Sequence, residues 1–314
     1  MTYRVLVSAP YAMPVIDRYR RELEARGCEV VVAEVRERLD EEELLALVGD
    51  IDGIICGDDR LTARVLEQAP RLKVISKWGT GIDSIDREAA RARGVAVCNT
   101  PNAFSEPVAD TALAFMLHFS RRLAEMDRDI RAGRWNKPEL FALREKTLGI
   151  VGVGNCGKAV ARRAAAFGMT LLGNDPVPMP PEFLRETGIA MAPLDELLGR
   201  ADFVTLHPDL NPTSRRLIDA RTLALMRPTA FLVNTSRGPV VDEAALAAAL
   251  GAGRLAGAGL DVFEDEPLPA DSPLRRLGTC LLAPHNANSS PAAKERVHRN
   301  TIKNLLSGLG IAAG

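Results

Sequence analysis

Three side chains in the last third of the chain are of the types needed to move a proton and to hold a carboxylate. Arg237 lies in Asn-Thr-Ser-Arg-Gly, Glu266 comes just before a proline, and His285 just after one. Each follows an apolar run that predicts a strand, so we expect all three at the carboxyl edge of one sheet, where α/β folds bind ligands. Imidazole exchanges a proton near neutral pH, a carboxylate stabilises its charged form, and a guanidinium clamps a carboxylate. The set suits proton exchange with the hydroxyl or keto oxygen of a substrate that carries a carboxylate, with His285 as the base.

Each of these residues also has a purely structural interpretation. Arg237 could form a surface ion pair, Glu266 could be an exposed loop acid, and His285 could be a hydrogen-bonded core histidine. Their joint placement after three strands favours the catalytic interpretation. The other histidines lie inside helical patterns or at a strand end, and they are weaker candidates for the base: His118, His207 and His298.

A glycine pattern typical of dinucleotide binding lies between a predicted strand, 148–151, and a predicted helix, 158–167. The pattern is Gly152-Val153-Gly154-Asn155-Cys156-Gly157. Its first glycine permits a tight turn, its second lets a pyrophosphate approach the backbone, and its third lets helix and strand pack closely. The N-terminus of the helix then offers N–H groups to the phosphate. Without this context the glycines would indicate only a turn, but here they predict a bound dinucleotide.

An acidic residue follows the loop at the spacing that selects between dinucleotides. The next predicted strand, 170–173, ends in Asn174-Asp175-Pro176, about 20 residues beyond the loop. A carboxylate at this position accepts hydrogen bonds from the ribose hydroxyls and repels a 2′-phosphate. Asp175 could instead cap a helix. With the loop, it predicts NAD as the cofactor.

Short β-branched runs alternate with helical patterns along the chain, which predicts parallel sheets. The expected strands of the first half are 4–7, 29–32, 53–56, 72–76 and 95–98. A second series opens at residue 147 and continues with strands near Thr170, Phe203, Ala230 and Gly257. The predicted fold class is α/β, with two Rossmann-like, doubly wound parallel-sheet lobes and a cleft between them. A last helical stretch, 291–306, is expected to pack on the first lobe.

Between the two series lies a pattern rich in Ala, Leu and Met, residues 107–132, which ends in Gly133-Arg134-Trp135. The pattern predicts one long helix. Its apolar face could be ordinary core or a surface that joins two copies of the chain.

Composition narrows the class of partner. The chain has 314 residues, 46% of them apolar, which is enough for two domains. Its 40 basic and 41 acidic residues give a formal net charge of −1, so we expect a small-molecule partner and neither nucleic acid nor membrane. The N-terminus lacks the features of a signal peptide, and the longest apolar stretch, 111–119, is too short to span a bilayer, which predicts a soluble, cytoplasmic protein. The five cysteines are too dispersed for a disulfide framework or a metal site, and we expect free thiols and no metal.

These motifs, in this order, resemble the D-2-hydroxyacid dehydrogenase family, which includes phosphoglycerate, glycerate, formate and D-lactate dehydrogenases. Besides the motifs above, the likeness depends on the segment 77–86, Lys-Trp-Gly-Thr-Gly-Ile-Asp-Ser-Ile-Asp, on Asn99-Thr100-Pro101, and on Val108-Ala109-Asp110 at a helix start. The likeness covers most of the chain. It implies an NAD-dependent oxidoreductase that resembles phosphoglycerate dehydrogenase and acts as a 2-keto acid reductase, with the roles given above for the three reacting residues.

The resemblance also implies domain limits, an assembly and further contacts. A substrate domain of flavodoxin-like form would comprise residues 1–99 and 286–314, and an NAD-binding Rossmann domain would comprise 100–285. A homodimer would form through the nucleotide domain. The residues expected to bind the cofactor are Gly152, Gly154, Asn155, Cys156, Gly157, Asp175, Pro176, His207, Thr213, Thr235, Ser236 and Asp261. Those expected to bind substrate are Trp78, Gly79, Thr80, Gly81, Arg237 and His285.

Some positions depart from the family pattern. Where many relatives have Arg-Ser after the third strand, this chain has Cys56-Gly57-Asp58-Asp59, so a cation that commonly faces the substrate is missing. A phosphorylated substrate loses support unless another cation, such as Lys77 or Arg60, replaces it. The segments 207–210 and 286–290 also differ, and we expect no C-terminal regulatory domain.

The leading hypothesis is therefore an oxidoreductase that transfers a hydride between NAD(H) and a 2-hydroxy or 2-keto acid. One alternative from another class is an NAD(H)-sensing, dimerising regulatory protein on the same scaffold. Another is an enzyme for a different substrate, such as formate, phosphite or an amide-bearing acid. The sequence alone does not name the 2-hydroxy acid or the physiological direction.

Overall fold

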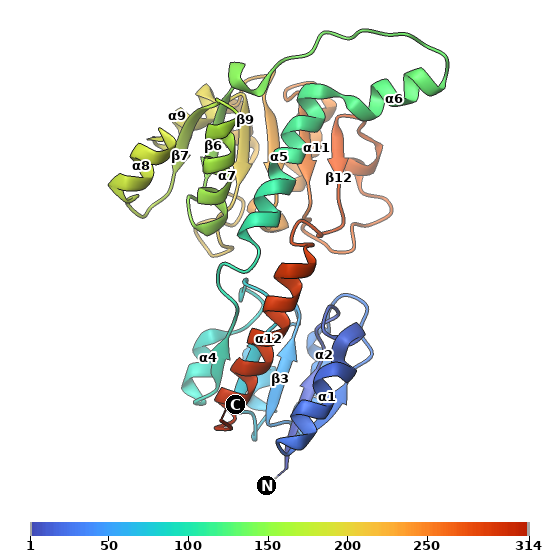
Figure 1. Ribbon diagram of the computed structural model, residues 1–314, viewed down its shortest axis with the longest axis vertical. Helices are drawn as coiled ribbons and strands as arrows, with labels where there is room; N and C mark the ends of the chain where they lie inside the picture. Colours follow the sequence, from blue (N-terminus) through green and yellow to red (C-terminus); the bar gives the residue numbers. More distant parts are fainter. Residues whose placement is uncertain (1, 313–314) are drawn as a thin grey trace. The chain divides into compact units, whose positions relative to one another are not determined.

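The computed structural model describes residues 2–312, and the chain divides into two compact units (Figure 1). The first is Met1–Phe104 with Ser290–Gly314, and the second is Ser105–Ser289. Each unit has one parallel sheet with helices on its faces, so the predicted α/β class with two Rossmann-like parallel sheets is confirmed. All five cysteines are free of disulfides, as expected. Within 2–312, none of the helices combines the length and the apolar character needed to cross a membrane.

The first unit contains a five-stranded sheet in the order β2-β1-β3-β4-β5. Its strands are β1 (Tyr3–Val7), β2 (Cys28–Val32), β3 (Gly53–Cys56), β4 (Val74–Lys77) and β5 (Ala96–Cys98). Its helices are α1 (Ile16–Ala25), α2 (Glu41–Leu45), α3 (Ala63–Glu67), α4 (Arg87–Ala92) and α12 (Pro291–Gly308), with short 3-10 helices at Met13–Val15 and Val48–Asp50. Every residue of β3 and β4 is buried, as in a parallel sheet covered on both faces.

The C-terminal helix α12 packs directly on this sheet. Ser76 in β4 donates a 2.8 Å hydrogen bond through Oγ to the carbonyl of Thr301. The approach is close because the contacts are made by glycines: a Cβ on Gly308 would lie 2.3 Å from Val74, and one on Gly53 would lie 2.8 Å from Leu305. The last helix is thus part of the core of the first unit.

An indole and an imidazole form a buried pair between β4 and α12. Trp78, which is 4% exposed, stacks on Tyr11 with ring centroids 4.9 Å apart. Its Nε1–H donates a 3.0 Å hydrogen bond to Nδ1 of His298, so that nitrogen must carry no proton. Burial lowers the pKa of His298. The pair therefore requires the neutral imidazole.

Because this pair requires a neutral imidazole, we expect the protein to lose stability in mild acid. The folded-state pKa of His298 lies below the unfolded value, so its contribution is complete above about pH 6.5 and is lost as the pH falls. Burial acts on His207 in the same direction, lowering its pKa to about 4. We expect urea unfolding, followed by Trp78 fluorescence in a Trp135→Phe background, to give a smaller unfolding free energy at pH 5 than at pH 7. His298→Gln, which keeps an acceptor without a titrating group, should show a shallower decline, and an equally steep one would contradict the assignment.

The second unit contains a seven-stranded parallel sheet in the order β12-β11-β10-β9-β6-β7-β8. Its strands are β6 (Thr147–Val151), β7 (Thr170–Asn174), β8 (Ala190–Met191), β9 (Phe203–Leu206), β10 (Phe231–Asn234), β11 (Gly257–Leu260) and β12 (Cys280–Leu282). Its helices are α5 (Ser105–Arg121), α6 (Leu123–Arg131), α7 (Asn155–Ala166), α8 (Pro181–Thr187), α9 (Leu194–Arg200), α10 (Ala220–Leu225) and α11 (Glu243–Gly251). Short 3-10 helices occupy Leu143–Glu145, Gly238–Val240 and Pro273–Arg276. The direction of winding reverses between β6 and β9, which is where doubly wound folds of this order bind dinucleotides.

The prediction of one long helix over 107–132 is wrong. Helix α5 ends at Arg121, Arg122 takes a left-handed conformation with φ 47°, and α6 begins at Leu123. Helix α5 buries one face, including Ala109, Ala112 and Met116, whereas α6 buries no residue. Once the chain leaves the core, nothing holds it in line with α5, and Arg122 instead forms an ion pair with Glu125 (Nη2 to Oε1, 2.6 Å).

Candidate active site

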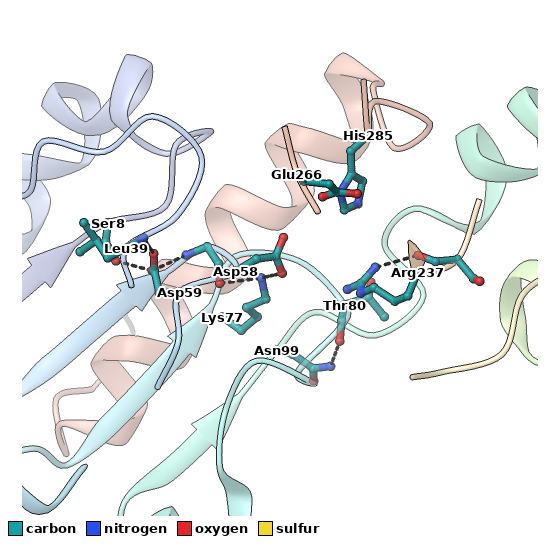
Figure 2. Close-up of polar contacts among 12 residues, drawn as sticks. Ser8, Leu39, Asp58, Asp59, Lys77, Thr80, Asn99, Arg237, Glu266 and His285 are labelled. Atoms are coloured by element: carbon teal, nitrogen blue, oxygen red, sulfur yellow. Dashed lines mark hydrogen bonds and ion pairs between the residues drawn. The ribbon is translucent and has the colours of Figure 1, made fainter. Parts of the chain in front are cut away.

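His285 and Glu266 form a hydrogen-bonded pair in the second unit. Nδ1 of His285 lies 2.8 Å from Oε2 of Glu266, and Figure 2 shows the carboxylate beside the ring. The other oxygen, Oε1, accepts a 2.9 Å hydrogen bond from the main-chain N–H of Phe263, so the plane of the carboxylate is fixed. A carboxylate can only accept, which places a proton on Nδ1 and leaves Nε2 to exchange one with a ligand. The side chains are 23% and 19% exposed, so the pair is partly shielded from water.

The backbone of His285 is held in an unusual conformation. Its φ is 49°, a left-handed value that a side chain other than glycine rarely adopts. The N–H of His285 donates to the carbonyl of Asp261 (2.7 Å), and the carboxylate of Asp261 accepts from the N–H groups of Asn286 (2.9 Å) and Ala287 (2.8 Å). Asp261 is 1% exposed, and burial raises the pKa of its carboxyl. Asp261, at the end of β11, thus fixes the loop that carries the imidazole.

Arg237 lies in the loop after β10, which Asn234 organises. The buried Asn234 amide donates to the carbonyl of Arg237 (3.0 Å), and its oxygen accepts from N–H and Oγ of Ser236 (3.0 and 2.8 Å). Nη1 of Arg237 donates to the Ser236 carbonyl at 3.1 Å. The guanidinium also lowers the pKa of the Cys156 thiol, although burial, the larger effect, raises it. Arg237 is therefore close to the glycine loop.

The glycine after Arg237 brings two loops into contact. A Cβ on Gly238 would lie only 1.8 Å from the carbonyl carbon of Phe263, so only glycine fits. Phe263 is the residue whose N–H binds Glu266. The structure therefore brings the Arg237 loop against the Glu266 loop, and Glu266 against His285.

The predicted dinucleotide loop joins β6 to α7. Gly152 has φ 85°, and a Cβ there would lie 2.6 Å from the main-chain nitrogen of Pro208. A Cβ on Gly157 would lie 2.1 Å from the carbonyl oxygen of Gly152, so the helix packs closely on the turn. A Cβ on Gly154, by contrast, would meet nothing within 4 Å. The packing of the protein itself thus requires the first and third glycines, whereas a side chain at the second would meet no protein atom.

Asp175, just after β7, ties this loop to the neighbouring strand. Its Oδ2 accepts a 2.7 Å hydrogen bond from the N–H of Val153, and its Oδ1 accepts a 2.8 Å bond from the N–H of Val177. Asp175 and Pro176 follow the strand next to β6, at the same sheet edge as the loop. The structure thus gives Asp175 a local bonding role, and its contact with the ribose stays a prediction.

The other predicted cofactor residues follow β9, β10 and β11. The Nδ1 of His207 and the Oγ1 of Thr235 are buried and have no hydrogen-bond partner among residues 2–312. Buried polar atoms are rarely left unpaired, so both suit contact with a ligand. Thr213 lies in an exposed turn, where its N–H and hydroxyl bind Oδ1 of Asn211. The open space at Gly154, the unpaired atoms and Asp175 all fit a dinucleotide at this edge.

Four of the residues expected to bind substrate, Trp78 to Gly81, lie in the first unit, just after β4. The indole of Trp78 is used inside the unit, where it donates to His298. The main-chain N–H of Trp78 donates to the carbonyl of Cys56 (2.9 Å). Gly79 has φ 126°. The N–H groups of Gly79, Thr80 and Gly81 find no acceptor within the described part of the chain. Consecutive N–H groups of this kind form anion-binding sites.

Two features of the site were missed by sequence reasoning. One is the anchoring of the His285 loop by Asp261, which was expected only as a cofactor contact. The other is Asn234, which shapes the Arg237 loop. Asn234 ends a buried strand just before the motif, and a buried amide at such a position is the signal that could have indicated it.

Comparisons with known proteins identify the family and relatives of this chain. The family described as D-isomer specific 2-hydroxyacid dehydrogenase, NAD binding domain, matches residues 113–287. A glyoxylate reductase of Korarchaeum cryptofilum is 41% identical over 271 residues, which are 84% of this chain and 81% of that protein.

Solved structures resemble the whole chain. D-lactate dehydrogenase from Aquifex aeolicus, complexed with NAD and lactic acid, superposes with a TM-score of 0.88 at 27% identity, over 98% of this chain and 95% of that one. An NADPH-dependent glyoxylate/hydroxypyruvate reductase from Sinorhizobium meliloti, in complex with NADP and malonate, has a TM-score of 0.85 at 30% identity, over 98% and 94%.

Proposed function

Because the chain belongs to the D-isomer specific 2-hydroxyacid dehydrogenases, and is thus an NAD(P)-dependent oxidoreductase, we propose that it reduces a short 2-keto acid with NADH. The observation that carries the proposal is the 2.8 Å hydrogen bond between His285 and Glu266, which leaves Nε2 as the proton-exchanging atom. We further propose that it acts in the cytoplasm, where NADH is available.

Each reacting residue has one task in the proposed mechanism. NADH, when bound, supplies the hydride that the keto carbon receives. His285 donates the proton from Nε2 to the oxygen that becomes a hydroxyl, and Glu266 stabilises the imidazolium before that transfer. Arg237 binds the carboxylate and the keto oxygen through its planar donors, and the N–H groups of Thr80 and Gly81 bind the carboxylate. In the oxidation direction His285 removes the hydroxyl proton.

Isotope transfer tests this proposal. The protein is incubated with glyoxylate and NADH that carries deuterium on both hydrogens at the reacting carbon of the nicotinamide. We expect glycolate with one deuterium on the carbon that bears the hydroxyl, detected by mass spectrometry. Glycolate without deuterium, or none at all while NADH binds, would contradict hydride transfer to this substrate.

The carboxylate of Asp175 is proposed to select NADH over NADPH. Asp175→Asn keeps an acceptor oxygen for Val153 but removes the charge that repels a 2′-phosphate. We expect the ratio of kcat/KM for NADPH to that for NADH to rise about tenfold or more, equal to about 1.4 kcal/mol. Asp195→Asn, an equal charge change on the exposed face of α9, should leave the ratio unchanged. A wild-type preference for NADPH would refute this role of Asp175.

We also propose that two copies of the chain pair through α6 and the segment after it. Helix α6 buries none of its residues, and Leu123, Ile130 and Trp135 are 69%, 52% and 78% exposed. Large apolar side chains gathered on one exposed segment are typical of an interface, and symmetric dimers are the commonest assemblies.

Charge on this segment should separate the copies. We expect the Leu123→Glu/Ile130→Glu double variant to be monomeric in sedimentation velocity experiments in which the wild type is dimeric. Val177→Glu, at another exposed apolar residue of the same unit, should remain dimeric. A monomeric wild type, or a dimeric double variant, would rule out this interface.

A further inference from the structure

The carboxyl edge of the five-stranded sheet has its own reversal of winding. Strand β1 lies between β2 and β3, so the segments that follow β1 and β3 bound the point of reversal, and β4 is the next strand beside β3. Ligands of open α/β sheets bind at such points. Polar residues at this edge include Ser8 after β1, Asp58 and Asp59 after β3, and Lys77, the last residue of β4 (Figure 2).

Asp59 fixes the shape of the segment after β3. Its side chain is fully buried and accepts hydrogen bonds from Oγ of Ser8 (2.6 Å) and from the N–H groups of Leu39 (2.7 Å) and Gly57 (3.0 Å). Burial raises the pKa of Asp59, and these donors oppose that shift. Every bond of Asp59 is directed into the protein, so it supports the loop and leaves Asp58 as the carboxylate nearest solvent.

The ammonium group of Lys77 is hydrogen-bonded to the loop after β3. The register of β3 and β4 places Cys56 beside Lys77. The Nζ of Lys77 donates to the carbonyl of Gly57 and to Oδ1 of Asp58, both at 2.7 Å. The lysine side chain is only 4% exposed, whereas that of Asp58 is 42% exposed. The cation is thus covered, and the partly exposed group at this edge is a carboxylate.

The same edge carries the N–H groups proposed to bind the substrate carboxylate. Lys77 directly precedes Trp78, and the segment 79–81 follows. The amide of Asn99 holds the carbonyl of Thr80 from the other side (2.5 Å), which fixes the turn. The pairing of β3 with β4 therefore places Asp58 and Lys77 at the same sheet edge as segment 79–81. With Asp59 included, two carboxylates face one ammonium, and a second anionic group on the substrate would be repelled.

We propose that Asp58, held by Lys77, is a specificity-determining residue that selects 2-keto acids with a short uncharged side chain, such as glyoxylate or hydroxypyruvate. Keto acids that carry a phosphate or a second carboxylate are rejected. The hydroxyl of hydroxypyruvate can donate to Asp58, whereas a phosphate cannot. This inference rests on the proposed function, since it names the substrate class of the same site.

The test compares an acid with its phosphate ester, one pair by binding and another pair by turnover. Binding of D-glycerate and of 3-phospho-D-glycerate to the NADH-loaded full chain is measured by calorimetry, and kcat/KM is measured for hydroxypyruvate and for its phosphate ester. The wild type should prefer the member without the phosphate by about 100-fold or more in both measurements. In Asp58→Asn the preference should fall by about tenfold or more, because the repulsion by Asp58 is gone and the positive charge of Lys77 is no longer neutralised by it. Asp17→Asn, an equal charge change at an exposed residue of α1, should keep the wild-type ratio.

The two measurements separate the two proposals. If no keto acid is reduced but the binding preference falls in Asp58→Asn, the proposed reaction is wrong and the assignment of Asp58 stands. If the wild type prefers the phosphorylated ligands, if Asp58→Asn keeps the wild-type ratio, or if neither acid binds, the assignment of Asp58 is wrong, whether or not turnover occurs.

Discussion

Replacing His285 with alanine is expected to lower kcat about 100-fold or more while leaving the Kd for NADH nearly unchanged. The imidazole is placed to exchange a proton, because its Nδ1–H binds Glu266 and the basic nitrogen of that tautomer is Nε2. The cofactor is expected to be bound by other residues, at the glycine loop and beyond β7. Steady-state kinetics with a 2-keto acid gives kcat, and fluorescence titration gives the affinity for NADH.

A matched control uses a histidine that has no place in the site. His118 lies on α5 and packs edge-on against Phe119, so His118→Ala should keep wild-type turnover. If His285→Ala also retained turnover, His285 would have to be removed from the mechanism. If it lost NADH binding together with turnover, its role would be structural, through the strained loop that Asp261 holds.

Alanine at two of the loop glycines is expected to have sharply different effects. A Cβ on Gly157 would collide with the backbone of Gly152, so Gly157→Ala should lower the Tm by about 4 °C or more and also weaken NADH binding. A Cβ on Gly154 meets no protein atom, so Gly154→Ala should keep the wild-type Tm. It should still raise the Kd for NADH about tenfold or more, because the Cβ would occupy the space proposed for the pyrophosphate.

Gly278→Ala serves as the control for adding a methyl group. A Cβ at that position also meets nothing within 4 Å, and it lies away from the loop. Differential scanning calorimetry and NADH titration of the three variants give both quantities. Wild-type affinity for NADH in Gly154→Ala would show that no pyrophosphate lies over this glycine.

Much of the fold could be predicted because buried parallel strands leave a clear signal. Strands such as β3 and β9 are buried along their whole length, and so appear in the sequence as short apolar runs between polar helices. Strand β8 was missed because its two residues are exposed at the sheet edge. The break at Arg122 was missed because neither glycine nor proline marks it; the end of the buried face of α5 decides it.

The reacting residues could be proposed from the sequence because each follows a strand end, and parallel strands bring such ends together. The contacts that other residues make around the site could not be predicted in the same way. Asp58 and Lys77 meet because β3 and β4 pair in a particular register, and the sequence does not state that register. Asp261 and the loop of His285 are likewise joined through hydrogen bonds to main-chain N–H groups, which depend on the backbone and not on a motif.

The most direct test of the central claim is NADH oxidation, followed at 340 nm, with glyoxylate and hydroxypyruvate as substrates and NADPH in parallel. Pyruvate, 2-oxoglutarate and phosphohydroxypyruvate complete the panel. We predict turnover with NADH on glyoxylate or hydroxypyruvate and much slower turnover on the acids that carry a second anionic group. Absence of turnover across the panel, in a protein shown to bind NADH, would contradict the claim that this chain reduces short 2-keto acids.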